Sequence, residues 1–293
     1  MRRSSAVRRV AVRATIRPPV RSEVSPAAAA WRIAADVAIY RLRKREAGNL
    51  ATSLTLALAL GLPWPDLAWR AAFGAGLNLF VYLVNDVFDV GIDLAAPGRD
   101  TERTRFLAAH LTEAKALCVG LALGLAAFGA LHSTGLLVTA LVNAAVIVAY
   151  SGYLKHRPVA DIASMGVWGV TMAMVGFPLE SAAGWRLAVL LGFLSMVTEA
   201  VQVVRDEPSD RAAGVRTTAV VYGPRAASRT AKVAMLAAAL YAAAAIHPAG
   251  LALALGVFVK LKPEQAAKSW DALRGLFGLT WLVLLALWRL RGG

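Results

Sequence analysis

Long runs of apolar residues, separated by short polar stretches, dominate the chain from residue 48 onward. Runs of about 17–25 apolar residues are long enough to cross a membrane as helices. Nine such segments are predicted, at residues 48–62, 67–92, 110–131, 134–152, 158–180, 184–204, 222–246, 248–261 and 270–290. The pattern therefore predicts an all-α polytopic membrane protein with about nine transmembrane helices.

The residues before these runs follow a different pattern. Residues 1–26 contain seven arginines and one acidic residue, and no apolar run follows the arginines, so a disordered basic tail is expected. Residues 27–46 combine Trp31 and Tyr40 with several cations, which is typical of a helix lying in the membrane interface. The predicted organisation is thus a tail, an interfacial helix and a transmembrane domain at residues 47–293.

The composition supports a membrane protein and gives its orientation. Hydrophobic residues make up 58% of the chain, against about 45–50% in ordinary soluble domains. With the N-terminus inside, 28 of the 32 lysines and arginines lie on the cytoplasmic side, and the exceptions are Arg70, Arg186, Arg289 and Arg291. This asymmetry and anionic lipid headgroups account for the net charge of +14, so membrane lipids and no nucleic acid are the expected partners.

A first acidic cluster ends the second apolar segment. Asp86, Asp89 and Asp93 follow one another at i, i+3 and i+7, which places them within about 60° on one face of a helix. Asn85 precedes the first aspartate, and the same face extends back through Tyr82. A polar stripe therefore leads from the middle of the membrane to its inner surface.

A second cluster of the same construction ends the sixth apolar segment. Asp206 and Asp210 lie four residues apart, and their face extends back through Gln202 and Glu199. Pro208 stands between the two aspartates, so a kinked helix end or a loop is expected there.

Five aspartates at the ends of apolar helices need compensation, because each ionised group inside the membrane costs roughly 2.5–3.5 kcal/mol on insertion scales. Mg²⁺ suits such oxygen ligands: it binds through one or two carboxylates and keeps other positions for water and phosphate oxygens. Two facing clusters would thus bind a diphosphate through bridging Mg²⁺. Nearby inner loops offer a clamp of cations and hydroxyls, namely Arg99, Arg103, Arg105, Tyr150, Lys155, Arg157, Arg211 and Arg216.

These motifs resemble the UbiA superfamily of intramembrane prenyltransferases over roughly residues 45–290. The pattern Asn-Asp-x-x-Asp-x-x-x-Asp occupies 85–93, and Asp-x-x-x-Asp occupies 206–210. The second motif continues as Asp-Arg-x-x-Gly-x-x-Thr at 210–217, and a Tyr-Ser…Leu-Lys loop lies at 150–155. The resemblance implies helices around a central cavity that opens sideways to lipid, with the acidic motifs at its cytosolic end.

The resemblance also implies roles for individual residues. Two Mg²⁺ ions are expected, one held by Asp86, Asp89 and Asp93 and the other by Asp206 and Asp210. Asn85 would hold the diphosphate or an aspartate. The diphosphate oxygens would contact Lys155, Arg105 and Tyr150. Phe106 replaces a proline that the family often has, so the roles of Arg103 and Arg105 stay open, and Arg211 completes the expected clamp. Catalysis would rest on Asp86, Asp89, Asp206, Asp210 and Lys155.

The expected activity is Mg²⁺-dependent transfer of a prenyl group from an isoprenyl diphosphate to an aromatic or other lipid-soluble acceptor, through an allylic carbocation. Three alternatives stay open: a terpene cyclase of the same superfamily, a phosphoribosyltransferase acting on a polyprenyl phosphate, and an ion-coupled transporter. The expected location is a bacterial inner membrane, with the site opening to the cytoplasm.

Overall fold

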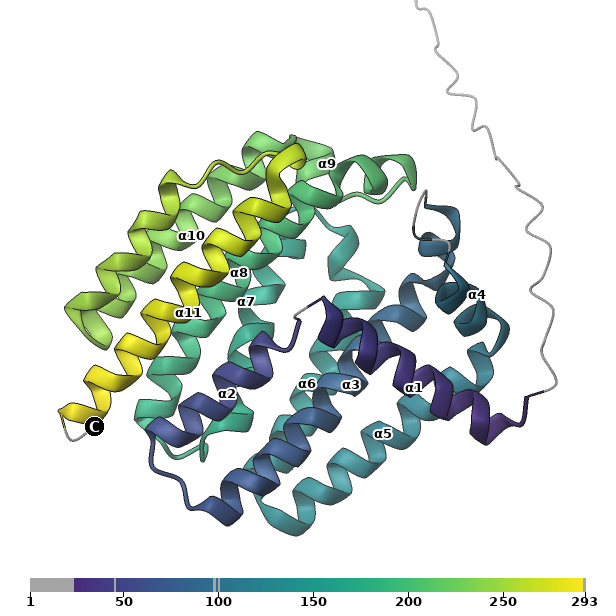
Figure 1. Ribbon diagram of the computed structural model, residues 1–293, viewed down its shortest axis with the longest axis horizontal. Helices are drawn as coiled ribbons and strands as arrows, with labels where there is room; N and C mark the ends of the chain where they lie inside the picture. The colour runs from purple at the N-terminus through teal and green to yellow at the C-terminus, as the bar shows by residue number, and fades with distance from the viewer. Residues whose placement is uncertain (1–23, 45, 97–98, 100, 292–293) are drawn as a thin grey trace, which may run out of the picture.

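The protein is helical throughout the described residues, with no strand among them (Figure 1). The computed structural model describes residues 24–44, 46–96, 99 and 101–291. In chain order the helices are α1 (Pro26–Arg43), α2 (Gly48–Ala59), α3 (Trp64–Ala95), α4 (Glu102–Ala109), α5 (Leu111–His132), α6 (Thr134–Gly152), η1 (Leu154–His156), α7 (Ala160–Ala173), η2 (Met174–Gly176), α8 (Ala182–Ala212), α9 (Thr218–Tyr222), α10 (Pro224–Ala245), η3 (Pro248–Phe258), η4 (Pro263–Gln265) and α11 (Ala266–Leu290).

The all-α polytopic architecture predicted from the apolar runs is confirmed. Each of the nine predicted segments falls on a helix: α2, α3, α5, α6, α7, α8, α10, η3 and α11. Five helical stretches in the described chain are long and apolar enough to cross a membrane, and they contain α3, α5, α6, α8 and α11. The number of nine crossings and the division into three regions stay predictions. Residues 1–23 of the predicted tail lie outside the described residues, and α1 covers most of the predicted interfacial helix.

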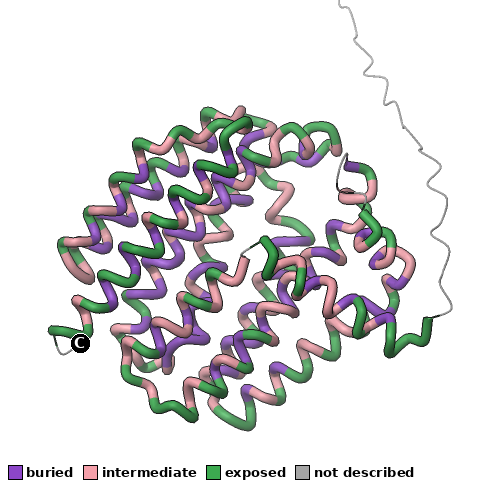
Figure 2. Tube along the Cα trace, viewed as in Figure 1, coloured by how far each residue is buried: buried purple, intermediate pink, exposed green. Residues whose placement is uncertain are grey.

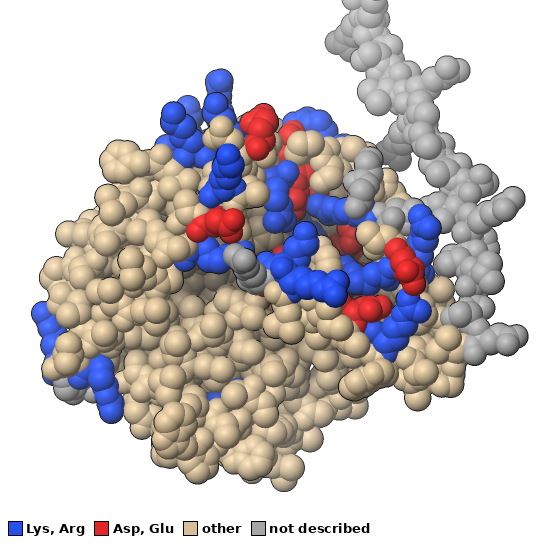
Figure 3. Space-filling view, in the orientation of Figure 1, with Lys and Arg blue, Asp and Glu red and all other residues tan. Residues whose placement is uncertain are grey.

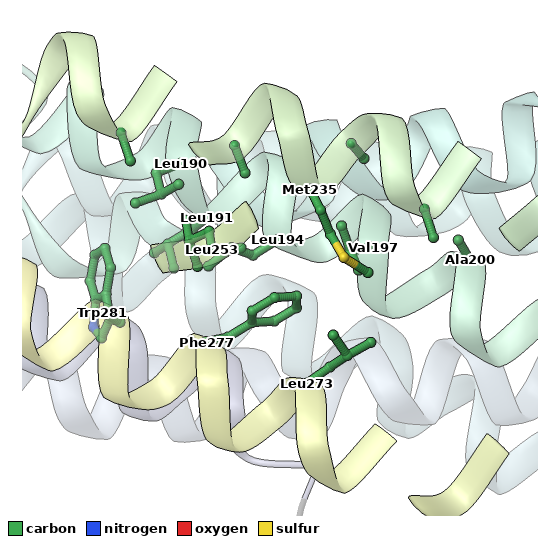
Figure 4. Close-up of a cluster of buried hydrophobic side chains, with 14 of the residues drawn as sticks. Leu190, Leu191, Leu194, Val197, Ala200, Met235, Leu253, Leu273, Phe277 and Trp281 are labelled. Carbon is green, nitrogen blue, oxygen red and sulfur yellow. The ribbon is translucent and has the colours of Figure 1, made fainter. Parts of the chain in front are cut away.

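Helix α8 forms the centre of the larger hydrophobic core. Its apolar stretch is 72% buried inside the protein, against 17% for that of α5. Figure 4 shows Leu190, Leu194 and Val197 of α8 together with Met235 of α10 and Phe277 of α11. A second core joins α3, α5, α6 and α7, and the buried positions lie between the helices (Figure 2). The core therefore holds α8 up to Val204, two residues before the second acidic motif.

Close contact between α7 and α8 depends on small residues. A Cβ atom added at Gly169 would lie 2.3 Å from the Ser195 Oγ and 2.7 Å from the Leu191 carbonyl oxygen. At Gly192 an added Cβ would lie 2.8 Å from the carbonyl oxygen of Gly166. Glycine at such positions allows the backbones of membrane helices to approach each other. The two helices are thereby fixed close together beside the cavities described below.

Gly169→Ala is expected to lower the melting temperature of the purified protein, because the added methyl group forces α7 and α8 apart. Overpacking of this kind costs about 1–3 kcal/mol. Thermal unfolding in one detergent would measure the change. Gly124→Ala is the matched control, since nothing lies within 4 Å of a Cβ there and alanine favours a helix over glycine. A Gly169→Ala melting temperature equal to that of the control would contradict the prediction.

Both acidic motifs lie entirely on helices. Helix α3 continues to Ala95, three residues beyond the predicted span, so Asp93 belongs to the same helix as Asp86. Helix α8 continues to Ala212 with Pro208 inside it, rather than ending in a loop. A proline inside a helix lacks the backbone N–H donor and crowds the carbonyl four residues earlier, which costs about 3 kcal/mol, so α8 carries a strained position between its two aspartates.

Candidate active site

Three adjoining cavities lead from one end of the molecule into its interior. The outer cavity, about 700 Å³, is lined by the acidic residues Asp86, Asp89, Asp93 and Asp206 and by several cations. The central cavity, about 280 Å³, is lined by Tyr150, Trp168, Glu199 and Asp210 among others. The inner cavity, about 370 Å³, is mainly apolar and is lined by residues of α2, α7, α8 and α11, including Met172, Leu191, Phe277 and Trp281.

Charge is concentrated at the outer cavity. In Figure 3 most of the visible lysines, arginines and acidic residues surround a hollow at one end, while the rest of this face carries few charges. Neighbouring cavities also share lining residues: Asn85, Lys155 and Asp206 line both the outer and the central cavity. Ser195 and Thr198 line both the central and the inner cavity. A polar opening thus continues into an apolar interior.

The first motif presents its carboxylates on one buried face of α3, as its spacing predicts. Asp86 and Asp89 are buried, with 4% and 7% of their surfaces exposed. The Asp86 carboxylate accepts a hydrogen bond from the Nη1 atom of Arg103 at 2.6 Å. Asp89 Oδ2 accepts hydrogen bonds from the Asn85 amide, at 2.9 Å, and from the Lys155 ammonium. These partners neutralise the two buried charges.

Arg99 joins the two motifs across the outer cavity. Its Nη1 atom lies 3.4 Å from an oxygen of Asp93 on α3, and its Nη2 atom lies 3.4 Å from an oxygen of Asp206 on α8. Arg99 lies between α3 and α4, outside the membrane-spanning segments, and burial tends to lower its pKa. The surrounding carboxylates outweigh burial and raise the pKa of Arg99 above its ordinary value. The motifs, 113 positions apart in the sequence, therefore face one another.

Helix α1 supplies a cation that the sequence did not reveal. Arg41 donates hydrogen bonds to the Asp86 carboxylate and to Glu46 Oε2, the latter at 2.7 Å. Its guanidinium also lies 4.3 Å above the centre of the Tyr82 ring. Burial opposes protonation, but the two carboxylates raise the pKa of Arg41 well above its ordinary value. Helix α1 therefore contributes directly to the wall of the outer cavity.

The loop that carries Lys155 is attached to α9. Val159, at the end of this loop, has a φ of 72°, which is unusual for a β-branched residue. Its backbone N–H donates to the Thr218 Oγ1 at 2.7 Å. The fully buried Asp161 accepts hydrogen bonds from the Thr218 hydroxyl and from the Thr218 N–H, the latter at 2.6 Å. These bonds hold the loop so that Lys155 reaches Asp89.

Tyr150 and Glu199 form a buried pair deeper inside. The Tyr150 hydroxyl donates to Glu199 Oε1 at 2.8 Å, and both residues line the central cavity. Gln202, one turn further along α8, lines the central and outer cavities. The polar stripe expected along Glu199, Gln202 and Asp206 thus follows the wall of these cavities. Tyr150 therefore contacts a carboxylate and shares the central cavity with Lys155 and Arg99.

Four of the eight residues of the expected clamp lie outside the cavities: Arg105, Arg157, Arg211 and Arg216 are exposed and line none of the three. Arg105 lies on α4. The Nε of Arg211 donates to the Glu207 carboxylate at 2.7 Å. Arg103, by contrast, lines the outer cavity and contacts Asp86. Of the two arginines that the sequence left open, the structure places Arg103 at the first motif.

The residues around the outer cavity suit Mg²⁺. Asp89 Oδ1 is buried and has no hydrogen-bond partner among the described residues, so one carboxylate oxygen is left for a cation. Within the described ranges, no group of three or more His, Cys, Asp or Glu side chains forms a ready metal site. Mg²⁺ does not need one, because it commonly takes one or two carboxylates together with water and phosphate oxygens.

The fold and the site together define an integral membrane protein with an acidic, cation-lined cavity above an apolar one. The profile of the UbiA prenyltransferase family matches residues 49–262, and the chain belongs to this family. The resemblance inferred from the motifs is therefore confirmed.

Curated relatives include enzymes from halophilic archaea. The digeranylgeranylglyceryl phosphate synthase of Halobacterium salinarum is 35% identical over 162 residues, which is 53% of this chain. That match spans only 56% of the relative's length. The lycopene elongase/hydratase of Haloferax volcanii is 28% identical over 261 residues, covering 84% of each chain.

Solved structures share the fold. A UbiA homologue from Archaeoglobus fulgidus, bound to GPP and Mg²⁺, aligns with a TM-score of 0.62 at 17% identity. The alignment covers 83% of this chain and 97% of the homologue. A structure described for digeranylgeranylglyceryl phosphate synthase aligns with a TM-score of 0.63 at 14% identity, covering 89% of this chain and 99% of the other. At these identities the likeness shows the fold alone, which is the UbiA fold expected from the sequence.

Proposed function

We propose that this protein is a Mg²⁺-dependent prenyltransferase that moves a prenyl group from an isoprenyl diphosphate to a lipid-soluble acceptor. One observation carries the proposal: two acidic helix ends face one another across a polar cavity, joined by Arg99, and this cavity continues into an apolar one. An amphiphile with a charged headgroup and an apolar tail fits this combination of a polar and an apolar cavity. The family and the ligands of its solved homologue support the same substrate class.

The diphosphate would lie in the outer cavity, among Lys155, Arg99 and Arg103. The carboxylates of the first and second motifs, each able to offer one or two oxygens, would hold two Mg²⁺ ions there, as the resemblance to the family implies. Bound Mg²⁺ supplies Lewis-acid stabilisation of the negative charge that develops on the leaving diphosphate. The lysine and arginine side chains would add fixed positive charge at the same place. Their pairing with aspartates keeps them oriented before the substrate binds.

The prenyl group would extend from the central into the inner cavity. When the bond between C1 and the diphosphate oxygen breaks, C1 becomes an allylic carbocation, and an apolar surrounding protects it from water. Trp168 lines the central cavity and offers a π face to this cation, whereas the Tyr82 ring already contacts Arg41. The acceptor then forms the new bond to C1 and loses a proton.

The distribution of charge favours an enzyme over an ion-coupled transporter. Among the described residues that line the inner cavity, Arg274 is the one charged side chain. A path for ions would need polar groups along the whole thickness of the membrane. Among the described residues, the acidic stripes are confined to the ends of α3 and α8 that line the outer and central cavities. The proposed orientation has the outer cavity open to the cytoplasm, in keeping with the positive-inside rule, and a bacterial inner membrane stays the predicted location.

Removal of Mg²⁺ tests the proposal. Protein in nanodiscs would receive geranyl, farnesyl or geranylgeranyl diphosphate, a pool of lipid-soluble acceptors, and either Mg²⁺ or EDTA. Diphosphate release is expected with Mg²⁺ and acceptor, to stop with EDTA, and to return when Mg²⁺ is added back. Release without any acceptor, giving a hydrocarbon or terpene alcohol, would instead identify a terpene cyclase. Absence of release from folded protein under every condition would refute both activities and favour phosphoribosyl transfer or transport.

A further inference from the structure

Arg274 is a cation at an unusual place. It lies where the central and inner cavities meet, and it lines both of them together with Gly48, Asn49, Ser195, Thr198 and Trp270. The rest of the inner cavity is formed mainly by aliphatic and aromatic side chains. Arg274 is half-buried there, and removing part of a charge from water is costly unless a partner compensates it.

No carboxylate of the described residues forms an ion pair with Arg274. Among the described residues, none of the ion pairs involves it, not even with Asp271, three positions earlier on α11. Its guanidinium lies 5.1 Å from the centre of the Trp270 ring, the one polar or aromatic contact it makes within the described ranges. The cations of the outer cavity differ in this respect, since Arg41, Arg99, Arg103 and Lys155 all contact aspartates.

The position of Arg274 on α11 directs it to the cavity. Trp270, Arg274, Phe277 and Trp281 recur at spacings of three and four, so they share one helix face, and all of them line the inner cavity. Lys268, near the same end of α11, is exposed and lines none of the cavities. A cation that only sets the orientation of the protein in the membrane can lie on the exposed surface, as Lys268 does. Arg274 therefore has a property that the positive-inside rule does not explain.

We propose that Arg274 binds the anionic headgroup of the acceptor, and that the acceptor is consequently an amphiphile bearing a phosphate monoester or a carboxylate. This inference rests on the proposed function. The planar guanidinium donates two parallel hydrogen bonds to either anion. Ser195 and Thr198 lie at the same junction and line the central cavity as well, so they orient the nucleophilic atom of the acceptor toward C1 of the donor.

Direct binding tests the proposal without any donor. The two probes are geranylgeranylglyceryl phosphate and geranylgeranylglycerol, which share a tail and differ in charge, with the protein in phosphatidylcholine nanodiscs. Arg274→Gln should weaken binding of the phosphate probe at least about tenfold, the usual scale for losing charge-assisted hydrogen bonds. Arg274→Lys should weaken binding of the phosphate probe less than Arg274→Gln does. Binding of the alcohol probe should change little.

Lys268→Gln is the matched control, because it removes a charge from the same end of α11 outside the cavities; it should leave both dissociation constants unchanged. If Arg274→Gln weakened binding of both probes by the same factor, Arg274 would have a packing role and the assignment would be overturned. Unchanged binding of the phosphate probe in Arg274→Gln, or no binding of it to the unaltered protein, would also overturn the assignment. Competition by phosphatidylglycerol at the concentration of the probe would reveal a site for bulk lipid headgroups and also overturn it. An Arg274-dependent phosphate site in a protein that releases no diphosphate would uphold the anion site while refuting prenyl transfer.

Discussion

Asp89→Asn is expected to slow diphosphate release by roughly 10²–10³-fold, the range found when one preorganised electrostatic group is removed from an active site. Asparagine preserves the size of the side chain and can still accept a hydrogen bond from Lys155. It cannot supply the negative charge that a Mg²⁺ ligand and the Lys155 ammonium require. The buried Oδ1 of Asp89, which has no partner among the described residues, is the oxygen most available to a metal.

The rate of diphosphate release with geranylgeranyl diphosphate and saturating Mg²⁺ would measure the effect. Size-exclusion profiles and melting temperatures would be compared in parallel, so that loss of fold is recognised. Asp271→Asn provides the control, because Asp271 is exposed on α11 and lines none of the cavities. If Asp89→Asn released diphosphate as fast as this control, the assignment of the first motif to metal binding would be wrong.

The sequence predicted the arrangement within each motif because helical geometry determines it. Residues at i, i+3 and i+7 share a face in any helix, so Asp86, Asp89 and Asp93 had to lie together. The same reasoning placed Gln202 on the cavity wall. Which motifs face each other depends on tertiary structure, and that expectation came from the resemblance to a family. Arg99, in contact with both motifs, now gives it a physical basis.

The cations were harder to predict, because a cytoplasmic arginine serves topology and chemistry alike. Arg41 lies 45 residues before Asp86, in a segment whose pattern indicates only an interfacial helix, and no local signal connects the two. Arg211 looked like part of the clamp because it follows the second motif, yet it pairs with Glu207 on the exposed side of α8. Arg274 lies within a predicted span. Its position in the lining of two cavities is the one feature that distinguishes it from an arginine that only sets the membrane orientation.

Lys155→Gln is expected to reduce diphosphate release by about 10²-fold or more and to raise the KM for the donor. Lys155 is the cation that contacts Asp89, and the hydrogen bonds of Thr218 with Val159 and Asp161 hold its loop in place. The substitution removes a positive charge that would stabilise the leaving diphosphate, and it leaves the buried Asp89 without its ion-pair partner. Lys155→Arg should recover part of the rate, because it restores charge with a different geometry.

Comparison of donors makes this test specific to the headgroup. Lys155 lines the outer and central cavities but not the inner one. Lys155→Gln should therefore lower the rate of diphosphate release from geranyl diphosphate and from geranylgeranyl diphosphate by the same factor. Lys232→Gln, an exposed change on α10 outside all three cavities, is the control and should leave the kinetics unchanged. A loss that grew with the length of the prenyl chain would place Lys155 at the tail. The diphosphate would then have to lie outside the outer cavity, because the cations of that cavity would no longer be the groups that stabilise the negative charge on the leaving diphosphate.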